Sequence, residues 1–163
     1  MIFLPLAGGI TLFARLLLSL VAALTLASTP SSAVDSRPDT PTTINNAKII
    51  AVGEARSLLD TKAARFFDTR NALNFGKGHV PGASLLAYKE KSEFATDFDA
   101  AQDSFDLSKL PADKDATIII YSHGPQGWKS YKAAVLSARA GYRNVLWMRE
   151  GFAGWTAKGL PVE

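Results

Sequence analysis

The feature that most constrains the fold is a β-branched apolar run that leads through a glycine-marked loop into a helical pattern. The run ATIIIY (116–121) is short and continuous, which favours a strand buried on both faces of a parallel sheet. SHGPQG (122–127) follows as a loop, and WKSYKAAVLSARAG (128–141) has helical spacing and ends at Gly141. Ligands of such sheets bind beyond the carboxyl ends of the strands, so this loop is the first candidate site.

Short strands alternate with helical segments along the rest of residues 48–163. This alternation predicts an α/β fold with βαβ crossovers, in which a mostly parallel five-stranded sheet has helices on both faces. The expected strands are 48–52, 64–70, 84–88, 116–121 and 144–148. The expected helices are 53–60, 72–75, 128–141 and 150–158. The polar and acidic section 89–115 is expected to hold one or two short helices anchored by its phenylalanines and leucines, and a solvated loop is favoured there over a partner surface.

The N-terminus differs in character from this domain. Arg15 is followed by the apolar run LLLSLVAALTLA and then by small residues that suit a cleavage site after Ala33. The pattern predicts a secretory signal peptide over 1–33, with the mature chain in the periplasm or secreted and without membrane contact. Because the first ten residues are also apolar, an uncleaved membrane anchor is the alternative. Residues 34–47 are rich in Pro, Thr, Ser and Asn, which predicts a flexible leader.

The composition excludes several classes of function. A chain of 163 residues with 47% hydrophobic and 20% charged residues is typical of one globular domain. A net charge of +3 with no basic patch argues against nucleic-acid binding. The chain contains no cysteine, which removes any thiol nucleophile, redox dithiol or cysteine-based zinc site. We expect no metal and no cofactor.

Five motifs occur in order along the domain. They are DTR (68–70), GHVPGA (78–83), the strand–loop–helix at Ser122, AGYRNVLWM (140–148) and GFAGWTAKGLPVE (151–163). Together they resemble a rhodanese-like domain, the fold of sulfurtransferases and some dual-specificity phosphatases. The nearer resemblance is to small exported members whose active loop carries two cysteines followed by Trp-Lys-Ser. Here Trp128, Lys129 and Ser130 keep that ending, while Ser122 and Gly127 stand where the subgroup has cysteine.

This departure bears directly on the activity that the resemblance implies. Sulfur transfer needs a thiolate that attacks a sulfane sulfur and holds it as a persulfide, which an oxygen nucleophile cannot form stably. We therefore predict that the chain is inactive as a sulfurtransferase. A Ser122 nucleophile would need a positioned base. His123 is its neighbour in sequence, and His79 belongs to a loop that resembles a structural motif of the family. No G-x-S-x-G elbow surrounds Ser122.

The loop could still bind an anion without its nucleophile. Gly124 and Gly127 allow backbone N–H groups to turn inward, and Lys129 adds charge near the helix start, although Pro125 has no N–H. The candidate anion-binding residues are Ser122, His123, Gly124, Gln126, Gly127, Trp128 and Lys129. Asp68, Arg70 and His79 are expected to be structural, the first two as an ion pair or a set of hydrogen bonds.

The leading hypothesis is therefore a binding module for a small oxyanion or a protein partner. An enzyme of sulfur or redox metabolism, or a Ser122-based hydrolase or phosphatase, is the alternative. A loop that only connects a strand to a helix, in a purely structural protein, is also open.

Overall fold

The apolar run at the centre of the sequence forms the central strand of the fold. In the computed structural model, which describes residues 37–163, β4 (Ile118–Tyr121) is buried along its whole length. It pairs in parallel with β2 (Arg65–Asp68) on one side and with β5 (Val145–Met148) on the other. The short strands β1 (Lys48–Ile49) and β3 (Ser84–Leu85) form the edges, which gives the order β1-β5-β4-β2-β3. The predicted parallel five-stranded sheet is confirmed.

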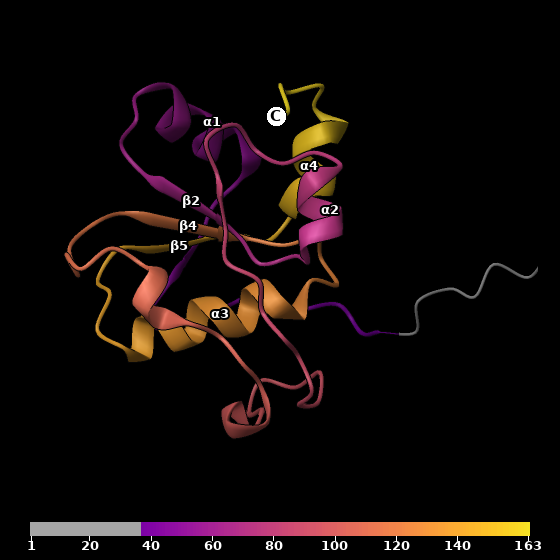
Figure 1. Ribbon diagram of the computed structural model, residues 1–163, viewed down its shortest axis with the longest axis vertical. Helices are drawn as coiled ribbons and strands as arrows, with labels where there is room; N and C mark the ends of the chain where they lie inside the picture. Colours follow the sequence, from indigo (N-terminus) through magenta and orange to yellow (C-terminus); the bar gives the residue numbers. More distant parts are fainter. Residues whose placement is uncertain (1–36) are drawn as a thin grey trace, which may run out of the picture. The chain divides into compact units, whose positions relative to one another are not determined.

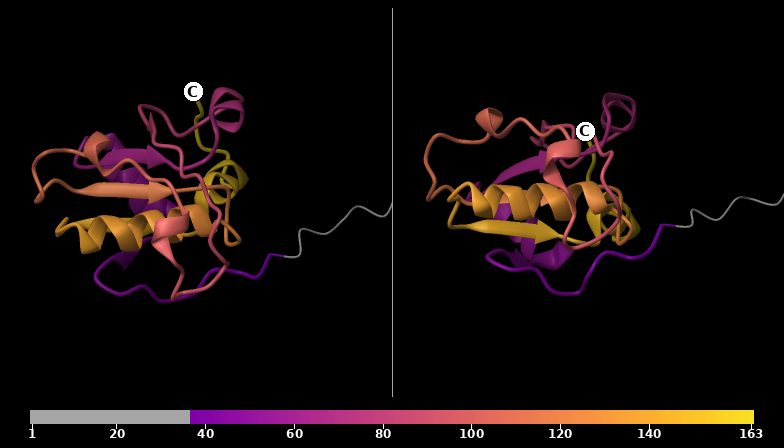
Figure 2. Two further views of the ribbon diagram at one scale, coloured as in Figure 1. Left: turned by 60° about the horizontal axis from the view of Figure 1, so that its bottom comes forward. Right: turned by 90° about the horizontal axis from the view of Figure 1, so that it is seen from below.

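Helices cover both faces of this sheet (Figures 1 and 2). They are α1 (Val52–Asp60), α2 (Ala72–Gly76), α3 (Trp128–Arg139) and α4 (Gly151–Ala157). Because side chains alternate along a strand, Ile118 and Ile120 pack into the hydrophobic cluster that includes the buried residues of α3. Ile119 and Tyr121 pack into a second cluster with residues of α1 and α4. The two clusters explain why the run 118–121 has no polar position.

The edge strands are shorter than the sequence indicated. Strands were expected over 48–52 and 84–88, but only two residues of each pair with a neighbouring strand. Residue 51 already has the role of N-cap, and α1 begins at Val52, whose side chain is fully buried. Beyond the assigned strands, single backbone hydrogen bonds continue from Ile50 to Trp147 and from Leu86 to Asp68, and both apolar side chains are buried in the core.

The section 89–115 crosses over the α3 side of the molecule. It contains two 3₁₀ helices, η1 (Ala100–Gln102) and η2 (Leu107–Lys109), which confirms the expectation of one or two short helices. The side chain of Asp99 accepts a hydrogen bond from the first turn of η1, and that of Asp106 does the same for η2. Phe98 and Leu110 are buried in the same cluster as α3, so the section is anchored by apolar contacts.

A buried lysine also holds this section against α3. Lys132, on α3, is fully buried and donates hydrogen bonds to the carbonyl and hydroxyl oxygens of Ser92 at 3.1 and 2.8 Å. Its Nζ lies 2.9 Å from Glu90 Oε1 and 3.8 Å from Asp103 Oδ2. Asp103 in turn accepts hydrogen bonds from the Ser92 hydroxyl and the Tyr88 phenol. Two acidic residues of the section, Glu90 and Asp103, therefore contact a buried lysine instead of facing solvent.

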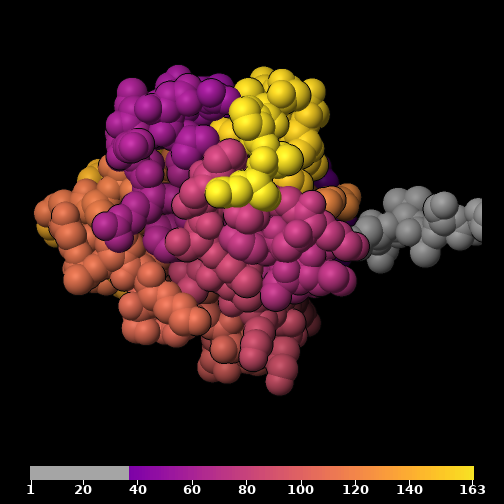
Figure 3. All heavy atoms as spheres, turned by 45° about the horizontal axis from the view of Figure 1, so that its top comes forward, coloured from indigo at the N-terminus to yellow at the C-terminus, as the bar shows by residue number. Residues whose placement is uncertain are grey.

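The C-terminal residues lie against the loop that follows α2 (Figure 3). His79 and Glu163 exchange two backbone hydrogen bonds of 2.9 and 3.0 Å. The His79 ring stacks on Phe75 with ring centroids 3.7 Å apart. His79 thus lies in a packed loop.

The N-terminal predictions are addressed only in part. Residues 1–33, interpreted as a signal peptide, lie outside the described residues. Within residues 37–163 no helix is long and apolar enough to cross a membrane. Residues 37–41, part of the predicted flexible leader, make defined contacts with the folded domain. The domain surface therefore includes residues that precede the expected boundary at residue 48.

Candidate functional site

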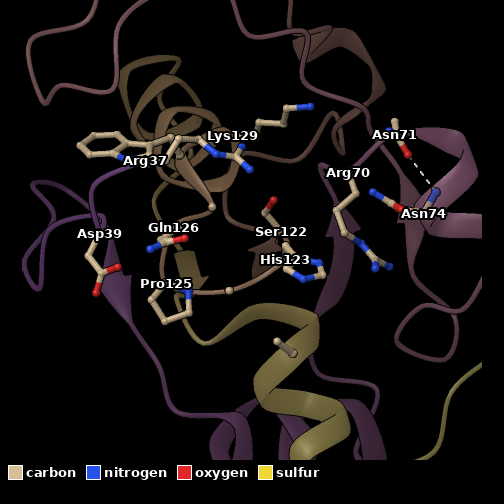
Figure 4. A pocket seen from close by; sticks show the side chains of 14 residues that line it. Arg37, Asp39, Arg70, Asn71, Asn74, Ser122, His123, Pro125, Gln126 and Lys129 are labelled. Carbon is tan, nitrogen blue, oxygen red and sulfur yellow. Dashed lines mark hydrogen bonds between the residues drawn. The ribbon is translucent and has the colours of Figure 1, made fainter. Parts of the chain in front are cut away.

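The β4–α3 loop (residues 122–127) lies at the carboxyl end of the central strand and borders a pocket of about 540 Å³ (Figure 4). The loop connects the buried β4 to α3 and is therefore anchored at both ends. All seven candidate residues named from the sequence line this pocket. The lining residues are Arg37, Asp39, Arg70, Asn71, Asn74, Ser122, His123, Gly124, Pro125, Gln126, Gly127, Trp128, Lys129 and Ala153.

The backbone of the loop is folded into a tight turn. The Gly127 N–H donates to the Gly124 carbonyl at 2.8 Å, and the Ser130 hydroxyl donates to the Gly127 carbonyl at 2.8 Å. The carbonyls of Ser122 and His123 accept hydrogen bonds from the beginning of α4. Five N–H groups at the loop and the start of α3 have no acceptor within residues 37–163, namely those of Ser122, His123, Gly124, Gln126 and Lys129. The loop thus satisfies several of its carbonyls and leaves donors available beside the pocket.

The Ser122 side chain extends into this pocket (Figure 4). The residue is only 4% exposed, yet its hydroxyl has no hydrogen-bond partner within residues 37–163. Because the hydroxyl oxygen is not among the buried side-chain atoms that lack a partner, it is open to the pocket, where it can hydrogen-bond with water or a ligand. A ligand oxygen there could accept a hydrogen bond from Ser122.

Neither histidine forms a nucleophile–base pair with Ser122 in the described residues. His123 lines the pocket but is exposed, and no hydrogen bond joins it to the Ser122 hydroxyl. His79 does not line the pocket; its Nδ1 lies 3.1 Å from the Phe75 carbonyl and its Nε2 3.9 Å from a carboxylate oxygen of Glu163. The arrangement that a serine nucleophile needs is therefore not assembled.

Asp68 and Arg70 form a buried ion pair at the end of β2. The Asp68 side chain is fully buried, and Arg70 Nη2 lies 2.6 Å from its Oδ2. The same nitrogen donates to the Gly78 carbonyl at 2.7 Å, and the guanidinium lies 4.1 Å from the centroid of the Phe152 ring. Arg70 also lines the pocket. Its hydrogen bonds to Asp68 and Gly78 and its contact with the Phe152 ring tie three segments together behind the site, and its charge is compensated by Asp68.

Several pocket residues were not identified from the sequence. Asn71 and Asn74 come from α2, where the Asn71 side chain accepts a hydrogen bond from the Asn74 N–H at 2.8 Å. The helix-capping signal of asparagine could have located the start of α2, but not its position beside the loop. Arg37 and Asp39 belong to the predicted leader, and no motif or hydrophobic pattern around them indicates that they lie at a pocket. Their place in the pocket depends entirely on tertiary contacts.

The arrangement defines a class of α/β domain with a glycine-containing loop at the carboxyl end of a central parallel strand, directly before a helix. The family model of the rhodanese-like domain matches residues 51–158. The chain therefore belongs to the rhodanese-like domain family. This confirms the resemblance found in the sequence and the fold expected from it.

Relatives and solved structures agree with this assignment. The chain is 28% identical over 116 residues to the protein YibN of Escherichia coli K12, covering 71% of each chain. It is 30% identical over 109 residues to the thiosulfate sulfurtransferase GlpE of Actinobacillus succinogenes, covering 67% of this chain and 84% of GlpE. The crystal structure of the Alr3790 protein from Anabaena superposes with a TM-score of 0.53 at 23% identity, covering 70% of this chain and 79% of that one. That similarity shows the fold.

The chemistry of this chain departs from a cysteine-dependent sulfurtransferase. Because the sequence contains no cysteine, no side chain can form a cysteine persulfide. Ser122 begins the loop at the position where the resembling subgroup has its first cysteine.

Proposed function

We propose that the chain is a binding domain that holds a small oxyanion at the β4–α3 loop and does not carry sulfur covalently. The observation that supports this most directly is Ser122, a residue only 4% exposed whose hydroxyl opens into the pocket without a hydrogen-bond partner in residues 37–163. A hydroxyl that faces an anion can donate its proton to it without chemical change. With serine in place of cysteine, the side chain at position 122 would thus donate a hydrogen bond to the ligand instead of attacking it.

The surroundings of Ser122 favour negative charge. Helix α3 is 12 residues long and begins directly after the loop, so its positive end and the unpaired N–H of Lys129 border the pocket. Lys129 adds a cation in the first turn of the helix. The one carboxylate among the lining residues, that of Asp39, lies 3.8 Å from Arg149 Nη2 and is compensated in part by that cation.

Export of this domain is part of the same proposal and is supported only by the sequence of residues 1–33. The apolar run after Arg15 and the small residues before Val34 have the pattern of a cleaved signal. The physiological anion would then be sought in the periplasm or outside the cell. Determining the N-terminal residue of the mature chain by mass spectrometry tests this point.

The binding proposal is tested by thermal unfolding with thiosulfate, sulfite, sulfate, phosphate and chloride at constant ionic strength. A ligand that binds only the folded state stabilises it by about 2.7 kcal/mol at one hundred times its Kd. We expect one or more tetrahedral oxyanions to raise Tm beyond chloride, and Ser122→Ala and Lys129→Ala to reduce the rise. The matched controls are Ser57→Ala and Lys158→Ala, which lie outside the pocket and should leave it unchanged. An equal response to all five salts would contradict small-oxyanion binding and favour a protein partner.

A further inference from the structure

Residues 38–41, termed the N-terminal strap, are hydrogen-bonded to the β4–α3 loop over a large sequence separation. The Pro125 carbonyl accepts from both the N–H and the hydroxyl of Thr40, at 2.8 and 2.5 Å. Thr40 is 2% exposed, so this contact is buried. Trp128 Nε1 donates to the Pro38 carbonyl at 2.8 Å. In Figure 1 the indigo strap passes the beginning of α3.

Arg149 holds the strap through its carbonyl groups. Its guanidinium donates to the Thr40 carbonyl at 2.7 Å and to the Pro41 carbonyl at 3.0 Å. The N–H, hydroxyl and carbonyl of Thr40 are therefore all used to attach the strap. Arg149 does not line the pocket, so it contributes to the site only by holding the strap and by its proximity to Asp39.

The contact with Thr40 fixes the orientation of one peptide group of the loop. The Pro125 carbonyl and the Gln126 N–H belong to the same peptide group, which is planar and trans, so the two point in opposite directions. Because Thr40 holds the carbonyl, the Gln126 N–H is directed away from Thr40. Gln126 lines the pocket, and its N–H has no acceptor within residues 37–163. This N–H is therefore available to a ligand.

Helix α4 orients two other loop peptides in the same way. The Phe152 N–H donates to the Ser122 carbonyl at 2.9 Å, and the Ala153 N–H donates to the His123 carbonyl at 2.8 Å. The N–H groups that share these peptides, those of His123 and Gly124, are unpaired within residues 37–163. Three unpaired N–H groups of the loop are thus oriented by donors outside it, and the strap supplies the donors for the third.

The peptide that Thr40 holds is the central peptide of a β-turn. The turn is closed by the bond from the Gly127 N–H to the Gly124 carbonyl, and Pro125 is its second residue. Such a central peptide can reverse while the turn stays closed, provided that the third residue adopts a positive φ. Gln126, the third residue, does not have a positive φ. The reversed form would direct the Pro125 carbonyl, a hydrogen-bond acceptor, to the side where the Gln126 N–H now lies.

We infer that Thr40 is a positioning residue of the anion site, and that attachment of the strap and binding of the anion are coupled through the 125–126 peptide group. The attached strap holds the loop in the form that presents the Gln126 N–H, and release of the strap lowers the affinity for the anion. This inference rests on the proposed function, because it assumes that the loop binds an oxyanion. It adds a means by which the segment before the domain regulates that site.

The coupling is tested first on the unmodified full chain, because it has to be reciprocal. A bound anion must strengthen attachment of the strap by the factor by which release of the strap weakens binding. We expect saturating sulfate, thiosulfate or phosphate, at constant ionic strength, to slow hydrogen exchange of the Thr40 amide about tenfold, the effect of one charge-assisted hydrogen bond. The Lys89 amide, which donates to the Ser104 carbonyl away from the pocket, is the control and should be unaffected.

Thr40→Pro tests the other half of the coupling. It removes both donors to the Pro125 carbonyl and should weaken binding of the same anions about tenfold in calorimetric titration. Thr40→Ser keeps both donors and should keep the wild-type affinity. Thr43→Pro is the matched control, because Thr43 is exposed and makes no hydrogen bond within residues 37–163. A wild-type affinity in a folded Thr40→Pro variant would overturn the inference.

Release of the strap also displaces charged residues that line the pocket, namely Arg37 and Asp39. The comparison is therefore repeated with Thr40→Pro in an Arg37→Gln/Asp39→Asn background. We expect the tenfold factor to persist there. A factor that disappears in this background would show that the strap acts through its charges, and the inference would be wrong.

Gln126→Gly identifies the peptide group through which the strap acts. Glycine adopts a positive φ at no steric cost, so the reversed turn becomes accessible and the strap alone selects the form. Thr40→Pro should then weaken the anion by a larger factor in the Gln126→Gly background than in the wild type. Equal factors in the two backgrounds would exclude the 125–126 peptide as the link.

The two proposals fail in different ways. If one of the three anions binds and is weakened by Ser122→Ala, while Thr40→Pro and the exchange of the Thr40 amide show no effect, the proposed function stands and the inference is wrong. If none of the three anions binds, both are wrong.

Discussion

The Gly124 carbonyl oxygen accepts a hydrogen bond from the Gly127 N–H at 2.8 Å, and a Cβ atom on residue 127 would lie 2.7 Å from that same oxygen. It would also lie 3.0 Å from Ser122 Cβ. The turn therefore leaves no space for a side chain at position 127. The second cysteine of the resembling subgroup could not be introduced here without a shift of the loop backbone.

Gly127→Ala should therefore destabilise the domain. Forcing a methyl group into this contact is expected to lower the free energy of unfolding by about 1–3 kcal/mol, as measured by urea denaturation. Gly53→Ala is the control, because a Cβ atom there meets nothing within 4 Å and lies in α1. That change should stabilise the protein by about 0.5–1 kcal/mol. Equal stability of Gly127→Ala and wild type would show that the turn opens readily.

Ser122→Cys alone should restore the missing nucleophile. The thiol would occupy the position of the serine hydroxyl in the pocket, where the beginning of α3 and Lys129 lower a thiol pKa. The thiolate would attack the sulfane sulfur of thiosulfate, release sulfite and hold the sulfur as a persulfide that cyanide removes. We expect thiocyanate formation by Ser122→Cys and none by the wild type. Ser57→Cys controls for a thiol elsewhere, and an inactive but folded Ser122→Cys would show that the loop geometry no longer supports the transfer.

Lys132→Met should be strongly destabilising although it replaces a charge with an apolar side chain. The change leaves the buried carboxylates of Glu90 and Asp103 without their cation, which typically costs about 3–5 kcal/mol. Chemical denaturation measures the loss. Lys158→Met, on the exposed end of the domain, should stay within about 0.5 kcal/mol of wild type. A similar small effect for Lys132→Met would mean that the two carboxylates become protonated or hydrated at little cost.

Asp103 should make stability depend on pH in the acid range. Burial alone would raise the pKa of its carboxyl, but hydrogen bonds from Lys91, Ser92 and Tyr88 lower the pKa from the ordinary 3.8 to about 2. Because the folded-state pKa is lowered, this stabilisation is complete above pH 3.8 and is lost as the pH falls toward 2. The contribution is on the order of 2 kcal/mol.

The measurement is the free energy of unfolding of wild type and Asp103→Asn between pH 5 and pH 2. The wild type should lose about 2 kcal/mol more than the variant over this interval. The exposed Asp113→Asn should follow the wild type. Parallel curves for wild type and Asp103→Asn would show that the carboxyl has an ordinary pKa in the folded protein.

Much of the fold could be predicted because its signals are local. The run 116–121 is apolar at every position, and only a central strand with helices on both faces buries both of its sides. Gly141 marks the end of the following helix, where its positive φ of 90° favours glycine. The edges of the sheet were less predictable, because an apolar residue packs equally well beside a two-residue strand or within a longer one.

The burial of Lys132 could not be predicted from the sequence. Lys132 lies in a helical segment whose composition is compatible with an exposed face, and its contacts lie some 30 to 40 positions earlier in the chain. The Asp68–Arg70 pair was accessible because the two residues are neighbours at the end of one strand. The two cases differ in sequence separation, because no local pattern shows which distant segment will cover a side chain such as that of Lys132.

The sequence by itself determined that the site cannot carry sulfur as a cysteine persulfide. It places an oxygen in the loop where the resembling subgroup has a sulfur, and without cysteine no persulfide can form. Only the tertiary structure decided that this hydroxyl opens into a pocket without a hydrogen-bond partner in the described part of the chain, and that Arg37, 85 positions earlier, lines the same pocket. The physical reason is that the atom able to form a bond is fixed by the identity of the side chain. The burial of that side chain and the charges around it depend on the distant segments that the fold brings beside it.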